Sequence, residues 1–208
     1  MTTVLYPGSF DPIHNGHVEI VETASRLFDR VVVATLHNPQ KRSGLFDLAE
    51  RSRLIAASLA HLDNVEVTSF SSLVVDLAKE VEASFIVKGL RAVSDFESEL
   101  QMAQTNTTIS GVDTLFIPSA SSHSFLASKL IREIARFGGE ISGMVPGGGG
   151  RLAPTIHRIE RGDSHMNDGV SFDEGYQDDD AYDTRPWPRV STGSTRRATT
   201  STARRPTT

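Results

Sequence analysis

The sequence predicts an α/β protein with a parallel sheet that is covered by helices on both faces. Two observations support this prediction. Short apolar runs alternate about five times with segments of helical periodicity before residue 146, and polar segments follow several of these runs. Repeated strand–helix alternation is typical of a doubly wound parallel sheet. Ligands bind such sheets beyond the carboxyl ends of the strands, so functional residues are expected directly after strands.

The expected strands are short runs of apolar residues, many of them β-branched. They cover residues 4–6, 31–36, 65–70, 85–87 and 114–117. Pro7-Gly8 ends the first run and Gly89 ends the fourth, and both are residue types that favour turns.

The expected helices carry apolar residues at spacings of three and four. They cover residues 18–28, 48–62, 73–81, 94–106 and 124–137. The second has the clearest start, because Asp47 can cap it and Glu50 stands three residues further on. Near its start the fourth carries Asp95, Glu97 and Glu99.

Length and composition narrow the class of protein. The 208 residues suffice for one domain with an appendage. The absence of cysteine excludes disulfide scaffolds, thiolate metal sites and cysteine nucleophiles. A net charge of −5 argues against a general nucleic-acid binder. No apolar run approaches the length of a membrane span and no secretory signal opens the chain, so a cytoplasmic protein without membrane contact is expected.

The composition changes near residue 147, where four consecutive glycines begin. We expect one domain over residues 1–146 and a disordered, low-complexity tail over 147–208, with a weak amphipathic helix possible at 151–161. The tail has too few apolar residues to offset the entropy lost on ordering.

The favoured role for the tail is that of a solvated spacer. Its acidic cluster between Asp173 and Asp183 could instead contact its own basic end or another protein. Phosphorylation of its many Thr and Ser residues also stays open.

The segment from Gly8 to His17 is the first candidate site. Its glycine allows a sharp turn and close approach to a ligand, and the amides that open the next helix favour an anion. His14 and His17, three residues apart, can face one pocket.

The segment lacks the Walker and G-x-G-x-x-G patterns. Capping or surface roles for the histidines stay open. A zinc site is a weak reading without a third ligand, so no protein metal site is expected.

Three further polar segments follow strands or open a helix. Lys88 and Arg91 flank Gly89, an arrangement that suits phosphate, although a solvated surface pair would look the same. Residues 38–42 follow the second strand, and residues 124–129 open the last helix with hydroxyls and amides. Together these segments favour a nucleotide or phosphorylated substrate.

Two stretches carry a family resemblance. Gly8-Ser9-Phe10-Asp11-Pro12 with His14-Asn15-Gly16-His17 resembles the signature of the (T/H)xGH nucleotidyltransferases, with histidine at position 14 where many members carry threonine. Residues 87–103 read VKGLRAVSDFESELQMA and are similar to bacterial phosphopantetheine adenylyltransferases. Three short matches fit the same family in order: residues 38–41, 46–51 and 111–114. The resemblance covers roughly residues 3–146.

The resemblance implies a Rossmann-like nucleotidyltransferase fold and a reaction in coenzyme A biosynthesis. The adenylyl group of ATP would pass to 4′-phosphopantetheine, giving dephospho-CoA and pyrophosphate. The resemblance also implies Mg²⁺ held mainly by the ATP phosphates, a homohexamer, and feedback by coenzyme A.

Roles for individual residues follow from the same resemblance. His17 would be catalytic, donating a hydrogen bond to the α-phosphate or the bridging oxygen. The residues implied to contact ATP are Ser9, Phe10, His17, Gly89, Leu90, Arg91, Glu99, His123, Ser124, Phe125, Leu126, Ala127, Ser128 and Lys129. The residues implied to bind the second substrate are Ser9, Lys41, Leu73 and Lys88, with Lys41 at its phosphate and Leu73 along its pantetheine arm.

One stretch departs from the family pattern. Ala127-Ser128-Lys129 stands where the family usually has a run of hydroxyl residues. Ser128 could keep the key contact while Lys129 supplies a cation to pyrophosphate. Alternatively, Lys129 points to solvent and ATP binding is weaker.

Two other functions stay open. One is a different adenylyltransferase, such as one acting on nicotinate mononucleotide, against which residues 88–103 argue. The other is a nucleotide-binding or regulatory module without turnover, with the tail as its working part.

Overall fold

A five-stranded parallel sheet forms the centre of the computed structural model, which describes residues 1–36 and 44–149. Its strands are β1 (Thr3–Gly8), β2 (Arg30–Leu36), β3 (Val65–Phe70), β4 (Phe85–Leu90) and β5 (Asp113–Pro118). They lie in the order β3-β2-β1-β4-β5, and each neighbouring pair is parallel. The chain builds outward from β1 to β3 and then returns to add β4 on the other side of β1. This reversal confirms the expected doubly wound sheet.

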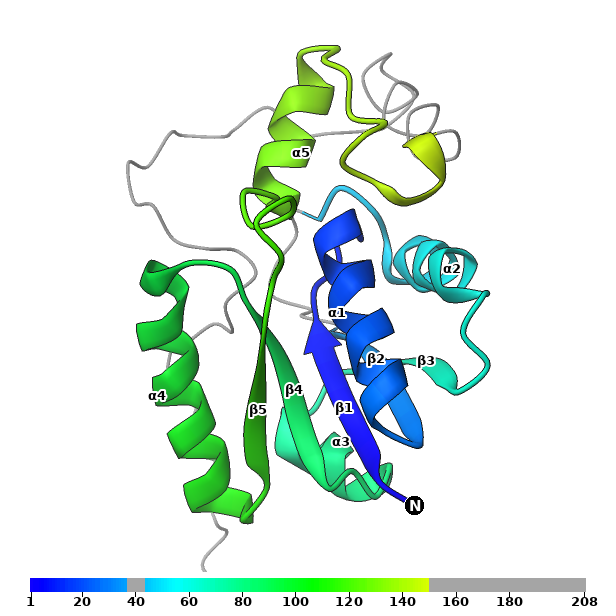
Figure 1. The fold of residues 1–208 in the computed structure, drawn as a ribbon. Coiled ribbons are helices and arrows are strands. Elements are labelled where there is room, and N and C mark those ends of the chain that lie inside the picture. Colours follow the sequence, from blue (N-terminus) through cyan, green and yellow to red (C-terminus); the bar gives the residue numbers. More distant parts are fainter. Residues whose placement is uncertain (37–43, 150–208) are drawn as a thin grey trace, which may run out of the picture.

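Within the described residues, five α-helices connect or follow the strands (Figure 1). They are α1 (Asn15–Leu27), α2 (Leu48–Leu59), α3 (Val74–Glu80), α4 (Val93–Ser110) and α5 (Ser128–Arg136). A short 3₁₀ turn, η1 (Pro146–Gly149), includes the first three of the four glycines at the expected domain boundary. The rest of the expected tail, with the possible helix at 151–161, lies outside the described residues.

Alternate residues of each central strand feed two separate cores. Val4 and Val31 pack with α1, α2 and α5 on one face of the sheet. Leu5 and Val32 pack with α3 on the opposite face. Figure 1 shows the helix α4 along the β4–β5 side of the sheet. Both faces are therefore covered, as expected for strands that are apolar on both sides.

Several elements begin or end at other residues than the sequence predicts. α1 begins at Asn15, three residues before the predicted start, because His14 caps it. A capping role for the histidines was one of the open alternatives, although histidine is not among the preferred capping residues. α4 extends to Ser110, beyond the predicted end at residue 106. Gly111 caps it with a φ of 77°, the left-handed conformation that glycine adopts readily.

The prediction that the last helix begins at residue 124 is wrong. α5 begins at Ser128, and the preceding residues form turns in which the Leu126 amide donates to the carbonyl of His123. Leu126 is buried although it lies outside the helix. In the sequence its apolar side chain continues the helical spacing of apolar residues, which is why the prediction placed the start too early.

The buried carboxylate of Asp11 ties three parts of the chain together. It accepts hydrogen bonds from the backbone amides of Leu45, at 2.8 Å, and Phe46, at 3.0 Å. Arg132 on α5 lies 3.6 Å from the same carboxylate and also donates to the carbonyl oxygen of Asp11. The turn after β1, the segment that leads into α2, and α5 therefore share one anionic centre.

We predict that Asp11→Ala lowers the free energy of unfolding by about 3 kcal/mol, because the buried Phe46 amide and the partly buried Leu45 amide lose a charged acceptor and Arg132 loses its counter-charge. Urea unfolding would measure the loss. The control is Asp29→Ala, which removes an exposed carboxylate that accepts from the Thr2 amide, and we expect it to cost below about 1 kcal/mol. Equal losses in the two variants would contradict the role of Asp11.

Candidate active site

A pocket opens at the carboxyl ends of β1 and β4, where the direction of winding reverses. Strand ends and the turn after β1 contribute Tyr6, Pro7, Gly8, Ser9, Phe10, Lys88 and Gly89. The helices α1 and α4, the residues that lead into them and the loop after β5 contribute His14, Gly16, His17, Ile20, Arg91, Asp95, Glu99, Ser119, His123 and Leu126. The pocket therefore lies where a doubly wound sheet is expected to bind its ligand.

His14 and His17 cap the start of α1 reciprocally. The His17 amide donates to Nδ1 of His14 at 3.3 Å, and the His14 amide donates to Nδ1 of His17 at 3.2 Å. The two rings stack, with centroids 3.5 Å apart and planes at 22°. A backbone amide can only donate, so Nδ1 of each ring accepts. When the ring of His17 is neutral, its proton is therefore on Nε2.

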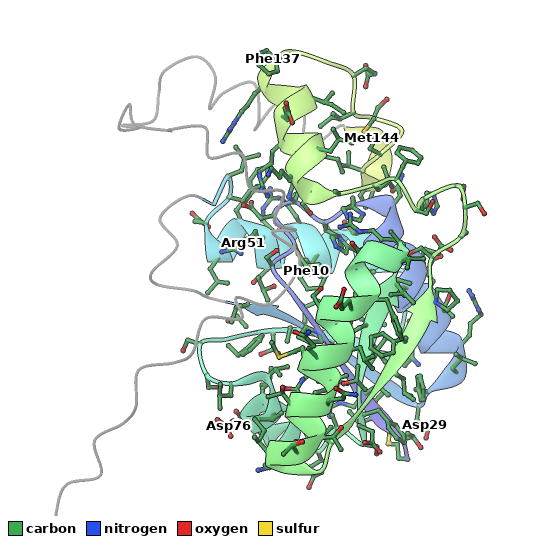
Figure 2. All side chains as sticks on the ribbon, turned by 90° about the vertical axis from the view of Figure 1, so that its left-hand side faces the viewer. Phe10, Asp29, Arg51, Asp76, Phe137 and Met144 are labelled. Carbon is green, nitrogen blue, oxygen red and sulfur yellow. The ribbon has the colours of Figure 1, made fainter. Side chains whose placement is uncertain are left out.

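Phe10 supports the ring of His17 from the side. Its ring meets His17 edge to face, with centroids 5.0 Å apart, and is almost fully buried. The φ angle of Phe10 is 47°, an uncommon conformation for a bulky residue. A Cβ atom at Gly8 would stand 2.9 Å from the Phe10 ring, so this turn requires glycine. Arg51 on α2 binds the residue before Phe10, because its Nη1 donates to the Ser9 carbonyl at 2.9 Å. Figure 2 labels both Phe10 and Arg51.

The environment of His17 keeps its imidazole neutral. Burial, followed by the positive charges of Arg91 and Lys88, lowers the pKa of His17 to about 3. At neutral pH the ring therefore presents a neutral N–H donor to the pocket rather than a charge. His17 and Arg91 both line the pocket.

Two carboxylates of α4 hold the two cations of the pocket. Lys88 Nζ lies 3.0 Å from Glu99, and both side chains are about nine-tenths buried. Arg91 Nε donates to Asp95 at 2.9 Å. Asp95 and Glu99 stand four residues apart on α4, which places them on one face of the helix. The cations are thus oriented and charge-balanced before any anion enters.

The loop of residues 119–127 forms another wall of the pocket. Its start is bound by the Ser119 amide, which donates to the Leu90 carbonyl at 2.9 Å. Near its end Arg91 Nη1 donates to the Leu126 carbonyl at 2.6 Å. Ser128 then begins α5, with its hydroxyl donating to the Pro12 carbonyl at 2.9 Å.

Most of the predicted site residues lie together in this pocket. They are Ser9, Phe10, His17, Lys88, Gly89, Arg91, Glu99, His123 and Leu126. Others lie outside its lining: Leu73 caps α3, Leu90 ends β4, Ser124, Phe125 and Ala127 lie in the loop, and Ser128 and Lys129 begin α5. Lys129 is exposed, and Lys41 lies outside the described residues.

Sequence reasoning assigned no role to three residues that shape the pocket. Asp11 and Asp95 stand inside the motifs that carry the family resemblance, so their position was a usable signal. Glu19, on α1, binds the loop of residues 119–127 through a contact between residues more than 100 positions apart. No local pattern could have shown that contact.

Comparison with known proteins agrees with the geometry. Residues 5–134 match the family described as cytidylyltransferase-like. In overall fold the chain is similar to a candidate nicotinate-nucleotide adenylyltransferase from Vibrio parahaemolyticus, with a TM-score of 0.52 and 18% identity over 76% of this chain and 91% of that one. It is also similar to a bifunctional NMN adenylyltransferase/ADP ribose pyrophosphatase from Francisella tularensis, with a TM-score of 0.57 and 14% identity over 77% and 52%. At these identities the two structures establish the fold alone.

Fold, pocket and family match place the chain among the nucleotidyltransferases. Its sequence is 54% identical over 143 residues to the phosphopantetheine adenylyltransferase of Gloeobacter violaceus, covering 68% of this chain and 88% of the relative. It is 52% identical over 146 residues to that of Streptomyces coelicolor, covering 70% and 91%. The chain belongs to the phosphopantetheine adenylyltransferase family.

We predict that the His17 ring stays neutral between pH 5 and 8. NMR of the folded protein should show no titration of His17 in this range, whereas in urea the same ring should titrate near about 6.5. Between about pH 6.5 and the lowered pKa, the unfolded chain binds a proton that the native state does not. The free energy of unfolding should therefore fall as the pH falls through this window.

Replacing the ring by His17→Gln should reduce that dependence on pH. Titration of the folded His17 near pH 6.5 would contradict the prediction.

Proposed function

We propose that this chain transfers the adenylyl group of ATP to 4′-phosphopantetheine, giving dephospho-CoA and pyrophosphate. The observation that carries the proposal is the convergence of a neutral His17, Lys88 and Arg91 on one pocket in a member of this family. A phosphate oxygen of 4′-phosphopantetheine would attack the α-phosphorus and form a new P–O bond. The bond to the α,β-bridging oxygen would break, and pyrophosphate would leave with those electrons.

The chemistry requires positioning and charge stabilisation more than a base. The attacking phosphate is already an anion at neutral pH, so no side chain has to remove a proton from it. His17 would donate its Nε2–H to an oxygen of the α-phosphate, where negative charge has to be stabilised in the transition state. The reciprocal cap with His14 holds this donor in one tautomer and orientation before substrate arrives.

The phosphates of ATP would find donors on two sides. Lys88, near the end of β4, and Arg91, directly after it, offer charged groups. The first amides of α5 offer a second phosphate-binding site. Ala127 provides no side-chain cap for these amides, and a helix N-terminus favours anions. We therefore propose residues 123–129 as an ATP-binding segment, with Ser9, Phe10, Gly89, Leu90 and Glu99 completing the nucleotide side.

The acceptor would be held by Ser9, Lys88, Lys41 and Leu73, as the family resemblance implies. Leu73 follows β3 at the same edge of the sheet as the other strand ends, and its exposed apolar side chain suits a pantetheine arm.

Magnesium fits this arrangement as a companion of the nucleotide. Among residues 1–36 and 44–149 no group of three His, Asp or Glu side chains is placed to hold a metal ion. The pocket carboxylates Asp95 and Glu99 are bound to Arg91 and Lys88. The ATP phosphates would supply the main ligands, as this ion prefers, and the ion would offset their charge.

A homohexamer and feedback by coenzyme A are further proposals that rest on the family. A cytoplasmic location is proposed from the sequence. A spacer role is proposed for the tail, most of which lies outside the described residues. In the described part of the chain no helix is long and apolar enough to cross a membrane.

The proposal predicts pyrophosphate release from ATP with 4′-phosphopantetheine and none with nicotinate mononucleotide. His17→Ala should lower kcat about 10²- to 10³-fold, because it removes a donor to the developing charge, while changing the KM values little. A coupled pyrophosphate assay measures both. Binding of ATP without pyrophosphate release would indicate the module without turnover, and release with nicotinate mononucleotide would indicate the other adenylyltransferase.

A second variant tests Lys129. We propose that its ammonium group, exposed on the first turn of α5, adds charge near the pyrophosphate. Lys129→Ser should raise the KM for ATP about two- to fivefold, the effect expected for one exposed charge, and more at low salt. An unchanged or lower KM would contradict a contribution of Lys129 to ATP binding.

A further inference from the structure

Glu19 links α1 to the middle of the loop of residues 119–127. Its Oε1 accepts a hydrogen bond from the Ala120 amide at 2.8 Å, and its Oε2 lies 2.7 Å from Nδ1 of His123. One carboxylate therefore holds both a backbone group and a side chain of the same loop. We propose that Glu19 is a positioning residue that holds this loop against the pocket and thereby sets the affinity for ATP. The proposal rests on the function proposed above.

The protonation of this contact follows from its geometry. An ionised carboxylate only accepts hydrogen bonds, so Nδ1 of His123 carries the proton that lies between them. The side chains of Glu19 and His123 are 24% and 33% exposed, so neither is freely solvated. A contact of this length to a charged acceptor is stronger than a neutral hydrogen bond.

The ends of the loop are bound by the Ser119 amide and by Arg91 at the Leu126 carbonyl. Glu19 binds the residues between these two points, at Ala120 and His123. The loop also packs directly on the start of α1, because a Cβ atom at Gly16 would stand 3.5 Å from the His123 carbonyl oxygen. Without Glu19 the pocket wall formed by His123 would keep this packing contact but lose its side-chain hydrogen bonds to the helix that carries His17.

Glu19 contacts the pocket-lining residue His123 in this loop. It does not line the pocket, whereas Ser119, His123 and Leu126 do. Residues 123–129 are the proposed ATP-binding segment, so movement of the loop would weaken ATP binding. The proposed acceptor residues lie on other elements.

The chain provides a matched control on the same helix. Glu22, three residues further along α1, forms a similar pair with His61, with Oε1 2.9 Å from Nε2. Both partners lie away from the pocket lining, and their side chains are 39% and 52% exposed. Glu22→Ala removes the same kind of contact from the same helix.

The experiment compares Glu19→Ala, Glu19→Gln and Glu22→Ala with the unaltered full chain. ATP affinity is measured directly by calorimetry, and both KM values by pyrophosphate release. Glu19→Ala should weaken ATP binding and raise the KM for ATP about tenfold, as expected for loss of hydrogen bonds to a charged group. The KM for 4′-phosphopantetheine should stay within about twofold, and Glu22→Ala should change neither value.

Glu19→Gln tests the contact itself. Its amide oxygen can still accept from the Ala120 amide, and its amide nitrogen can donate to His123 in the other ring tautomer. It should therefore restore most of the ATP affinity. Melting temperatures should fall by similar small amounts in Glu19→Ala and Glu22→Ala.

Three results would overturn the proposal. They are unchanged ATP affinity in Glu19→Ala, equal losses for both substrates, and a Glu19→Gln variant as weak as Glu19→Ala. Failure of the proposed function would look different. The unaltered chain would bind ATP without releasing pyrophosphate, and the calorimetric comparison of the variants would still decide the role of Glu19.

Discussion

The site depends on the buried carboxylate of Asp11. Parallel strands bring loop ends to one edge of the sheet, but they do not fix how those loops sit relative to one another. Asp11 supplies that restraint, because it binds the amides of Leu45 and Phe46 and faces Arg132. The turn that precedes His17, the segment that leads into α2, and α5 are thereby held as one unit. A pocket for two anionic molecules needs such a rigid frame, since its donors must be in place before the substrates arrive.

Charges in the pocket are arranged before any ligand is present. Lys88 and Arg91 would repel each other and the proton on a charged His17, and α4 compensates with Glu99 and Asp95. The imidazole stays neutral as a result of burial and of those cations. An entering polyphosphate would meet oriented cations and a neutral donor, so little reorganisation would be needed as charge develops on the α-phosphate. The polyphosphate would also compete with these carboxylates for Lys88 and Arg91, and this competition would weaken its binding.

The capping role and the pocket-facing role of the histidine pair are compatible. Capping and pocket-facing roles were alternatives for His14 and His17, and the structure shows that each caps the helix through Nδ1. Because this bond uses the nitrogen nearer the backbone, the far nitrogen of His17 keeps its proton. A local helix cap thus determines which atom of a pocket residue can donate. Likewise, Asp95 and Glu99 of α4 follow the usual spacing for one helix face. Their partners are Lys88 in β4 and Arg91 directly after it.

The sequence by itself determined the fold class, the five strands, the approximate helices and most residues of the pocket. These depend on local periodicity, on turn residues and on motifs that lie close together in the chain. Tertiary structure decided the start of α5, because Leu126 is buried by packing rather than by helical position. It also decided the partners of Asp11 and the contact of Glu19 with Ala120 and His123. Such contacts join residues that are distant along the chain, and their geometry follows from how the completed sheet and helices pack rather than from any local pattern.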